Sequence, residues 1–233
     1  MINVLDRQSR IVGLKIDMHK IKIMFNSLAT EQKFKIGSEV LEVVKEYVYL
    51  GQVVTADPYH EREITRIRMG WSAYGRFSQI MNGSLLISLE RKVYNSCNLP
   101  VLTYGAEMWR LTKTDQLKLR TTQRAMERKM IGVTLRDRKR AEWVREQTRV
   151  NDILVEIKRK KWAWAGHVMR RQDDRWSLRI TWWIPREGKR SRGRQKVRRA
   201  DEIKKFAGIG WVQLANDRVN WRDMGEAFAL QWV

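Results

Sequence analysis

Cysteine and histidine are scarce in this sequence, and their scarcity excludes several kinds of site. Cys97 is the only cysteine among 233 residues, so the chain cannot form an internal disulfide; this is typical of an intracellular protein. The three histidines, His19, His60 and His167, are far apart. With a single cysteine they cannot form a zinc finger or knuckle at the usual spacings. The sequence also has no long apolar run and no recognisable signal peptide, so we expect no membrane partner.

The motifs of common enzyme classes are absent as well. There is no phosphate-binding P-loop and no paired-glycine fingerprint. Nucleophilic catalysis needs a base beside the nucleophile, but Cys97 and His167 are isolated in the sequence. Asp173 and Asp174 lie in a polar stretch between arginines, with no third carboxylate nearby for two-metal chemistry. We therefore predict no catalytic residues, no metal and no cofactor in this chain.

Positive charge is abundant and unevenly distributed. The formal net charge is +21. Residues 1–57 carry a net +1 and residues 206–233 a net −1, whereas residues 58–150 carry +10 and residues 151–205 carry +11. Such a field is typical of proteins that bind nucleic-acid backbones. We therefore expect RNA and DNA as partners and an intracellular, nuclear location.

The hydrophobic pattern predicts a mainly α protein with a small N-terminal β portion, an α+β fold. Residues 1–15 predict a helix that ends at Gly13, and alternating apolar residues then predict strands and a hairpin around Gly37. Apolar residues next recur at helical spacing, with Asp57 and Pro58 as the start signal. The predicted strands cover residues 20–25, 34–36, 39–44 and 47–55. The predicted helices cover residues 58–81, 88–109 with a break near Pro100, 112–132, 135–149, 151–171, 200–207 and 211–232.

This pattern divides the chain into three parts. Residues 1–56 are rich in strands, residues 57–150 are helical, and residues 151–233 form a basic, tryptophan-rich helical extension. Within the extension, residues 186–199 are low in apolar side chains and carry eight basic ones. Such a composition predicts a flexible linker.

Residues 151–171 combine tryptophans, a histidine and a dense basic run within one predicted helix. We expect Asn151 to be its N-cap, because an asparagine side chain can accept hydrogen bonds from free N–H groups of the first turn. Lys161 falls inside the apolar arc of this helix, which should face a core. The alternative is a solvated helix with a charged outer face. The arc consists of Ile153, Leu154, Ile157, Trp164, Ala165 and Val168.

Basic and aromatic side chains are interleaved in this extension. Lysines and arginines contact phosphates, and aromatic rings stack on bases. This pattern predicts nucleic-acid binding by the basic run beside Trp162 and Trp164 and by residues 175–199. For the tryptophans the alternative is packing in a core. For residues 186–199 the alternative is a solvated linker or a nuclear-localisation segment.

Several blocks of the sequence are specific when they are taken together. GLKID at residues 13–17 with the following KIKIMF, and YVYLG at residues 47–51, lie in the strand-rich part. LPVLTYGAEMW, TTQRAMERKMIGVTLRDRKR, KWAWAGHVMRR and DDRW begin at residues 99, 121, 161 and 173. Over essentially the whole chain these blocks resemble RTE-like non-LTR retrotransposon endonuclease-reverse transcriptases. The resemblance implies the last palm strands and primer grip, then a helical thumb, then a downstream extension.

The departures from the family pattern are local. Asp17 stands where the family usually has asparagine, and Ile21 where it has threonine. Gly193-Arg194-Gln195 and Arg198-Arg199 replace its usual late block. The resemblance also implies that the family's catalytic Ala-Asp-Asp turn, its other catalytic aspartate and its endonuclease domain would precede Met1. Mg²⁺ is then expected only for the full-length parent enzyme.

The resemblance and the basic pattern together give a set of site residues. Tyr49, Leu50 and Gly51 are expected to place the primer end. The duplex backbone is expected to contact Arg120, Arg124, Arg128 and Lys129. RNA or target DNA is expected to contact Lys158, Lys160, Lys161, Trp162, His167, Arg170, Arg171, Arg192 and Arg194.

We therefore interpret the chain as a non-catalytic C-terminal part of a retrotransposon reverse transcriptase that retains nucleic-acid-binding elements. Two alternatives remain at this point. One is an independent basic nucleic-acid-binding protein. The other is a degenerate remnant without function, because the few palm strands lack the sheet with which they should pair.

Overall fold

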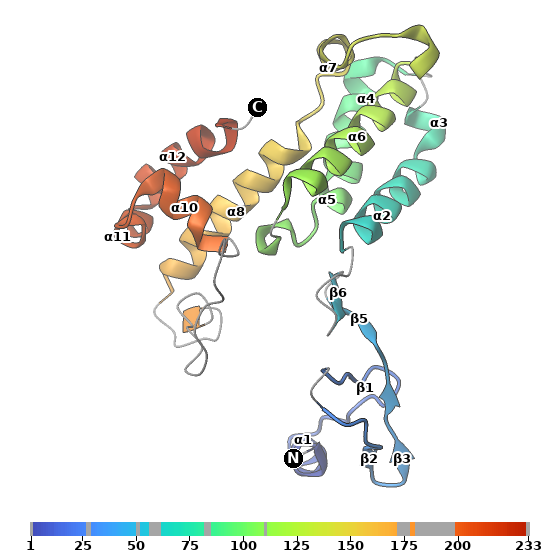
Figure 1. Cartoon of the computed structure of the whole chain (residues 1–233), viewed down its shortest axis with the longest axis vertical. Coiled ribbons are helices and arrows are strands. Elements are labelled where there is room, and N and C mark those ends of the chain that lie inside the picture. Colours follow the sequence, from blue (N-terminus) through green and yellow to red (C-terminus); the bar gives the residue numbers. More distant parts are fainter. Residues whose placement is uncertain are drawn as a thin grey trace. The chain divides into compact units, whose positions relative to one another are not determined.

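The computed structural model describes residues 2–26, 29–49, 52–55, 62–81, 85–109, 111–171, 178–179 and 199–231. The chain forms two compact units, Met1–Thr65 and Arg66–Val233, which we call unit 1 and unit 2. Helices predominate and the strands are short (Figure 1). The predicted fold class, mainly α with a small N-terminal β portion, is confirmed.

Unit 1 begins with an amphipathic helix and continues with short strands. Helix α1 ends as predicted before Gly13. Gly13 has a φ of 76°, which glycine adopts at little steric cost because it has no Cβ. Gly37, at φ 60°, makes the tight turn of the predicted hairpin between β2 and β3. The elements of this part are α1 (Ile2–Ile11), β1 (Lys22–Ile23), β2 (Lys35–Ile36), β3 (Glu39–Val40) and β4 (Glu42–Val43).

The strand predicted at residues 20–25 is shorter in the structure. Only Lys22 and Ile23 form a ladder, in a parallel pair with β4, because β4 itself offers only two residues to pair with. The strand predicted at residues 47–55 is a hairpin of β5 (Glu46–Tyr49) and β6 (Gln52–Thr55), with Tyr49 opposite Gln52.

The first hydrophobic core of unit 2 lies where the helices before residue 131 meet the first turns of α8 (Ile153–Met169). Those helices are α2 (Arg62–Arg76), α3 (Ser78–Met81), α4 (Ile87–Val93), α5 (Leu99–Leu102) and α6 (Lys113–Met130). This first core is formed by Tyr74, Met81, Tyr94, Leu99, Leu102, Ala106, Leu119, Met126, Met130, Ile153, Leu154 and Ile157.

The break predicted near Pro100 is present. A π-helical turn, Tyr94–Asn98, separates α4 from α5, and Pro100 stands in the first turn of α5. Proline has no N–H to donate and its ring crowds the carbonyl four residues earlier, so the regular α-helical ladder cannot continue through it. A short 3₁₀ turn, Ala106–Met108, follows.

The segment between α6 and α8 differs from its prediction. A single helix was expected over residues 135–149, but the structure has a 3₁₀ turn, Leu135–Asp137, and then helix α7 (Ala141–Thr148). The intervening backbone is left-handed at Arg138, with φ 49°. Thr134 and Asp137 close a capping box at the start of the 3₁₀ turn, and the left-handed Arg138 ends the turn before α7 begins.

The N-cap of α8 is Asp152, so the prediction of Asn151 was wrong by one residue. The Asp152 carboxylate accepts hydrogen bonds from the N–H groups of Leu154 (2.9 Å) and Val155 (3.3 Å). Asn151 instead uses its backbone: its N–H donates to Asn95 Oδ1 and its carbonyl accepts from Gln123 Nε2. Asparagine and aspartate cap helices about equally well, so residue type alone does not choose between these neighbours. The long-range bonds of the Asn151 backbone leave the cap to Asp152.

Helix α8 lies between the earlier helices of unit 2 and the closing helices (Figure 1). It contributes side chains to two hydrophobic cores. Its first turns lie in the first core, and its later turns pack on the closing helices α10 (Arg199–Ala207), α11 (Trp211–Asn216) and α12 (Arg218–Leu230). The predicted boundary at residue 151 therefore falls just before the helix that both cores share. The second core is formed by Trp162, Ala165, Val168, Met169, Ile203, Trp211, Ala215, Trp221 and Phe228.

Within the described ranges, no helix has the length and apolar character needed to cross a membrane. Likewise, the described histidines, cysteines and carboxylates nowhere gather in a group of three that could hold a metal ion.

Candidate nucleic-acid interface

Trp162, a predicted nucleic-acid contact, lies in the second core. Its indole is 2% exposed and stacks on Trp221, with ring centroids 3.9 Å apart and planes at 13°. Each indole N–H donates to the other residue's carbonyl, at 2.6 Å from Trp162 and 3.0 Å from Trp221. The rings of Phe206 and Phe228 also contact the Trp162 ring. The Trp162 ring therefore packs α8 against α12 in the core and is not open to a nucleic acid.

Lys158 and Lys161 are also turned inward. Both are buried, and their ammonium groups lie 2.8 and 3.4 Å from one carboxylate oxygen of Glu202 on α10. Burial opposes the ionisation of Glu202, but the two lysines outweigh it and lower the pKa of this carboxyl below its ordinary value. This explains how Lys161 occupies an apolar arc: its charge is neutralised by a residue 41 positions away.

Arg124, predicted to contact the duplex, belongs to a buried charge cluster. Its guanidinium pairs with Glu127 and lies 3.5 Å from Asp152, which also receives Arg145 at 3.1 Å. Burial raises the pKa of Glu127, and Arg124 and a hydrogen bond from Thr148 only partly offset this. The cluster links α6, α7 and the start of α8.

Two further predicted residues donate to carbonyl groups of the fold. The Lys160 ammonium donates to Thr103 O (3.1 Å) and Oγ1 (2.7 Å), and the Arg170 guanidinium donates to Ala215 O (2.6 Å). Both side chains are half-buried. They hold α8 against the loop after α5 and against α11.

The remaining predicted residues that the structure describes lie at or near the surface. Lys129 and His167 are exposed, and Arg120, Arg128 and Arg171 are half-buried. The Lys129 ammonium lies 5.4 Å from the centroid of the Trp71 ring. Tyr49 ends β5, and Leu50, Gly51, Arg192 and Arg194 lie outside the described residues, as do Asp173 and Asp174.

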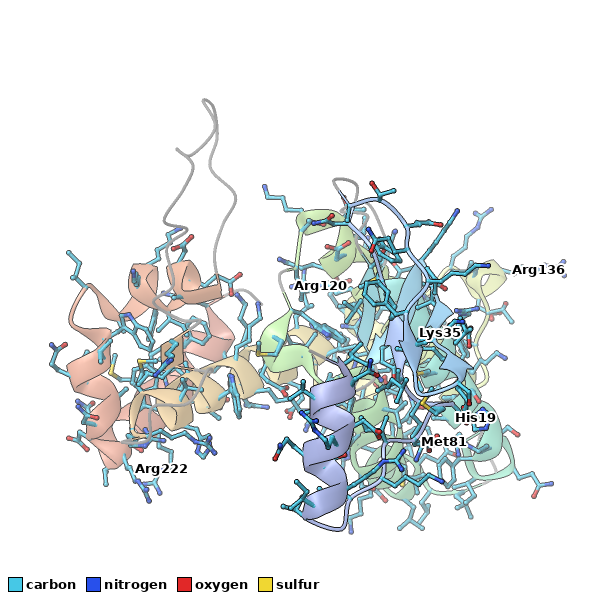
Figure 2. All side chains as sticks on the ribbon, turned by 90° about the horizontal axis from the view of Figure 1, so that it is seen from below. His19, Lys35, Met81, Arg120, Arg136 and Arg222 are labelled. Atoms are coloured by element: carbon cyan, nitrogen blue, oxygen red, sulfur yellow. The ribbon has the colours of Figure 1, made fainter. Side chains whose placement is uncertain are left out.

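A second group of cations was not among the predicted site residues. Arg136, Arg138, Lys139 and Arg140 are all exposed on the segment between α6 and α7. Figure 2 shows Arg136 at the periphery, well apart from Arg120 of α6. The run RDRKR at residues 136–140 is the available signal, but the hydrophobic pattern predicts it as part of a helix over residues 135–149. Because the chain instead turns left-handed at Arg138, these side chains spread over a turn.

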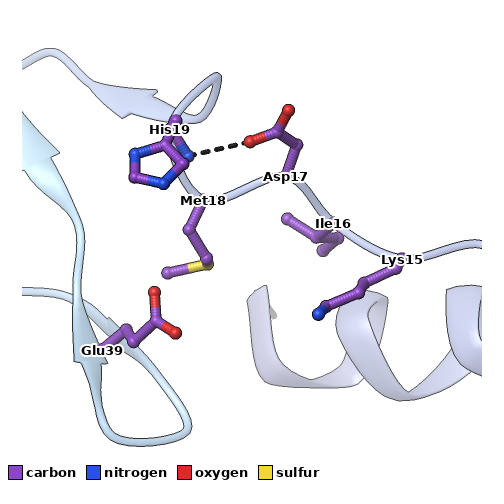
Figure 3. Close-up of a pocket in the computed structure, with 6 residues that line it drawn as sticks. All are labelled: Lys15, Ile16, Asp17, Met18, His19 and Glu39. Atoms are coloured by element: carbon purple, nitrogen blue, oxygen red, sulfur yellow. Dashed lines mark hydrogen bonds between the residues drawn. The ribbon is translucent and has the colours of Figure 1, made fainter.

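Unit 1 holds a separate pocket of about 320 Å³. Figure 3 shows it beside the turn at residues 15–19, with Glu39 of β3 opposite. The His19 backbone N–H donates to Asp17 Oδ1 at 3.0 Å, so this aspartate is used to hold the turn. The pocket is lined by Lys15, Ile16, Asp17, Met18, His19 and Glu39.

The fold and the surface define a mainly helical, strongly basic protein whose second unit is built around one shared helix. A protein of Caenorhabditis elegans whose name describes it as transposon-derived is 33% identical over 239 residues, which cover 95% of this chain and 86% of that protein. The chain belongs to the family of this transposon-derived protein. No protein-family model matches the sequence. No solved structure matches it either.

Proposed function

We propose that this chain is the nucleic-acid-binding, non-catalytic C-terminal part of a non-LTR retrotransposon reverse transcriptase. Unit 2 would hold a template–primer duplex of RNA and DNA through its phosphate backbone. The transposon-derived family supports the origin of the chain. The sequence block at residues 47–51 supports a primer grip, and the blocks at residues 99–109 and 121–140 support a polymerase thumb.

The observation that carries this proposal is the separation of the cations of unit 2 into two groups. In the first group, the side chains of Arg124, Lys158, Lys160 and Lys161 contact partners inside the fold, as described above. Others are exposed, and no carboxylate of the described residues lies within ion-pair distance of them. This second group includes Lys92, Lys113, Lys129 and Arg138.

Exposed cations without acidic partners suit a polyanion. Each raises the self-repulsion of the folded chain, and each can release a condensed counterion when it meets a phosphate. Backbone contacts of this kind give affinity without reading the sequence. This is what a polymerase thumb requires, because it must hold every duplex that passes.

Two charge-neutralising variants test the proposal. Lys129→Gln removes an exposed cation from the end of α6, and Arg222→Gln removes another exposed cation from α12, where Arg222 lies 3.4 Å from Asp223. Binding to a fluorescein-labelled RNA–DNA duplex is measured by anisotropy over a range of salt concentrations. For Lys129→Gln we expect the slope of log Kd against log salt to fall by about 1, as for one lost phosphate contact. Arg222→Gln should leave it unchanged, and equal slopes in both variants would contradict the proposed surface.

The absence of catalysis is tested separately. The pure chain is incubated with a primed RNA template, deoxynucleotides and Mg²⁺ or Mn²⁺, and primer extension is followed on a gel. We expect no incorporation, because polymerase chemistry needs converging carboxylates that bind two metal ions. Incorporation that persists through purification would refute the non-catalytic assignment and leave the binding proposal standing.

A further inference from the structure

The turn between α6 and α7 places an exposed aromatic ring among exposed cations. Trp143 is 36% exposed on the first turns of α7, although tryptophan is usually well buried. The Lys139 ammonium lies 5.1 Å from the centroid of its ring. Arg136, Arg138 and Arg140 are exposed on the same turn. We define these five residues as the Trp143 turn.

The acidic residues around this turn do not neutralise it. The Asp137 carboxylate accepts from Thr134 N–H (2.6 Å) and Thr134 Oγ1 (2.9 Å), which is the capping box of the 3₁₀ turn. Lys139 acts on this carboxyl through space and, after the bonds from Thr134, helps to lower its pKa. Among the residues that the structure describes, no carboxylate lies within ion-pair distance of the four cations of the turn. Their charge is therefore available to an external anion.

We propose that the Trp143 turn is a contact site for single-stranded RNA or DNA, in which a base stacks on Trp143 and the adjoining phosphates meet Lys139 and its neighbouring arginines. This inference rests on the proposed nucleic-acid binding and specifies a second site for it. In a duplex the faces of the bases are covered by their neighbours, so a side chain can stack only on an unpaired base. An aromatic ring among cations thus fits a single strand better than it fits a duplex backbone.

The Trp143 turn is separate from the basic side chains of α6. Arg120 of α6 and Arg136 of the Trp143 turn lie well apart (Figure 2). The capping box holds the first half of the turn, and the left-handed residue Arg138 redirects the chain into α7. A strand leaving a duplex could therefore be held by unit 2 at a second point.

The test compares Trp143→Ala with Trp143→Phe in the full chain. Binding is measured by anisotropy to a labelled 20-nucleotide oligouridine, to an RNA–DNA duplex, and to heparin as a polyanion without bases. For Trp143→Ala we expect single-strand affinity to fall about 5- to 50-fold, as for the loss of one stacked base. Duplex and heparin affinities should change less than about twofold, because their contacts are to charge alone. Trp143→Phe should recover most of the loss, since it keeps an aromatic face.

The outcomes distinguish this inference from the proposal on which it rests. If the wild-type chain binds none of the nucleic acids, both are refuted. If it binds the duplex while Trp143→Ala leaves single-strand affinity unchanged, only the Trp143 site is refuted. Equal losses for oligouridine and heparin would also refute it, because they would show a general effect on charge or folding. Far-UV circular dichroism of each variant confirms that the comparison is made between folded chains.

Discussion

Gly166 on α8 should tolerate no side chain, although alanine is the better helix former. A Cβ at this position would lie 2.4 Å from Trp221 Nε1 and 2.6 Å from Trp221 Cδ1. Both distances are far shorter than a van der Waals contact. The Trp221 indole that this Cβ would meet is held in place in two ways. It is stacked on the Trp162 ring, and its N–H donates to the Trp162 carbonyl. The ring therefore cannot move aside without breaking the joint between α8 and α12.

The magnitude of the Gly166→Ala effect follows from three contributions to the free energy of unfolding. The helix propensity of alanine adds about 1 kcal/mol of stability. Overpacking a rigid site costs about 1–3 kcal/mol. Disturbing the indole hydrogen bond costs about 1 kcal/mol more. We expect a net loss of about 1–3 kcal/mol, since the first contribution opposes the other two.

Urea unfolding followed by far-UV circular dichroism measures this loss. With a slope of about 2 kcal/mol/M, the midpoint should fall by about 0.5–1.5 M. Gly75→Ala is the matched control: Gly75 lies near the end of α2, and nothing lies within 4 Å of the Cβ that it would gain. There we expect a small increase in stability, up to about 1 kcal/mol. A Gly166→Ala chain as stable as the wild type would refute this account of the second core.

Two further predictions concern buried charges. Glu202→Gln should destabilise the chain by about 3 kcal/mol at pH 7, because it removes the charged carboxylate that the buried Lys158 and Lys161 share. The pKa of Glu202 is lowered in the folded state, so its stabilisation is present above the ordinary glutamate pKa and is lost as the pH falls through the folded value. Urea midpoints at several pH values should therefore converge for wild type and variant in acid, and parallel curves would contradict this. Asp152→Ala should lower the free energy of unfolding by about 2 kcal/mol in the same assay, because the N-cap and the ion pairs are lost. Asn151→Ala should lower it by less than about 0.5 kcal/mol. Equal losses would contradict Asp152 as the cap.

The sequence predicted which faces of the helices are buried better than it predicted what they contact. The apolar arc of residues 151–171, with Lys161 inside it, is a property of helical spacing and was visible in the pattern. Its partners were not visible. Glu202 is 41 residues from Lys161, and Trp221 is 59 residues from Trp162. Periodicity carries no information about such pairs, so Lys158, Lys161 and Trp162 were predicted to contact nucleic acid, although the structure buries all three.

The turns of the chain differ in whether their residue types reveal them. Gly13 and Gly37 were predicted to end a helix and to form a hairpin, and both have the positive φ that glycine adopts readily. Arg138 also has a positive φ, but nothing in its residue type announces it. In the structure Arg138 is the C-cap of the 3₁₀ turn, and its backbone N–H donates to the Leu135 carbonyl. The run of cations that it redirects was consequently assigned to a helix.

The salt dependence of duplex binding tests the central claim most directly. The wild-type chain is titrated onto a labelled RNA–DNA duplex at several concentrations of KCl, and log Kd is plotted against log salt. If unit 2 holds the phosphate backbone through several exposed cations, the plot should be linear with a slope of about 4 or more. A slope near zero, or no binding at low salt, would show that the exposed charge does not serve a nucleic acid and would contradict the account.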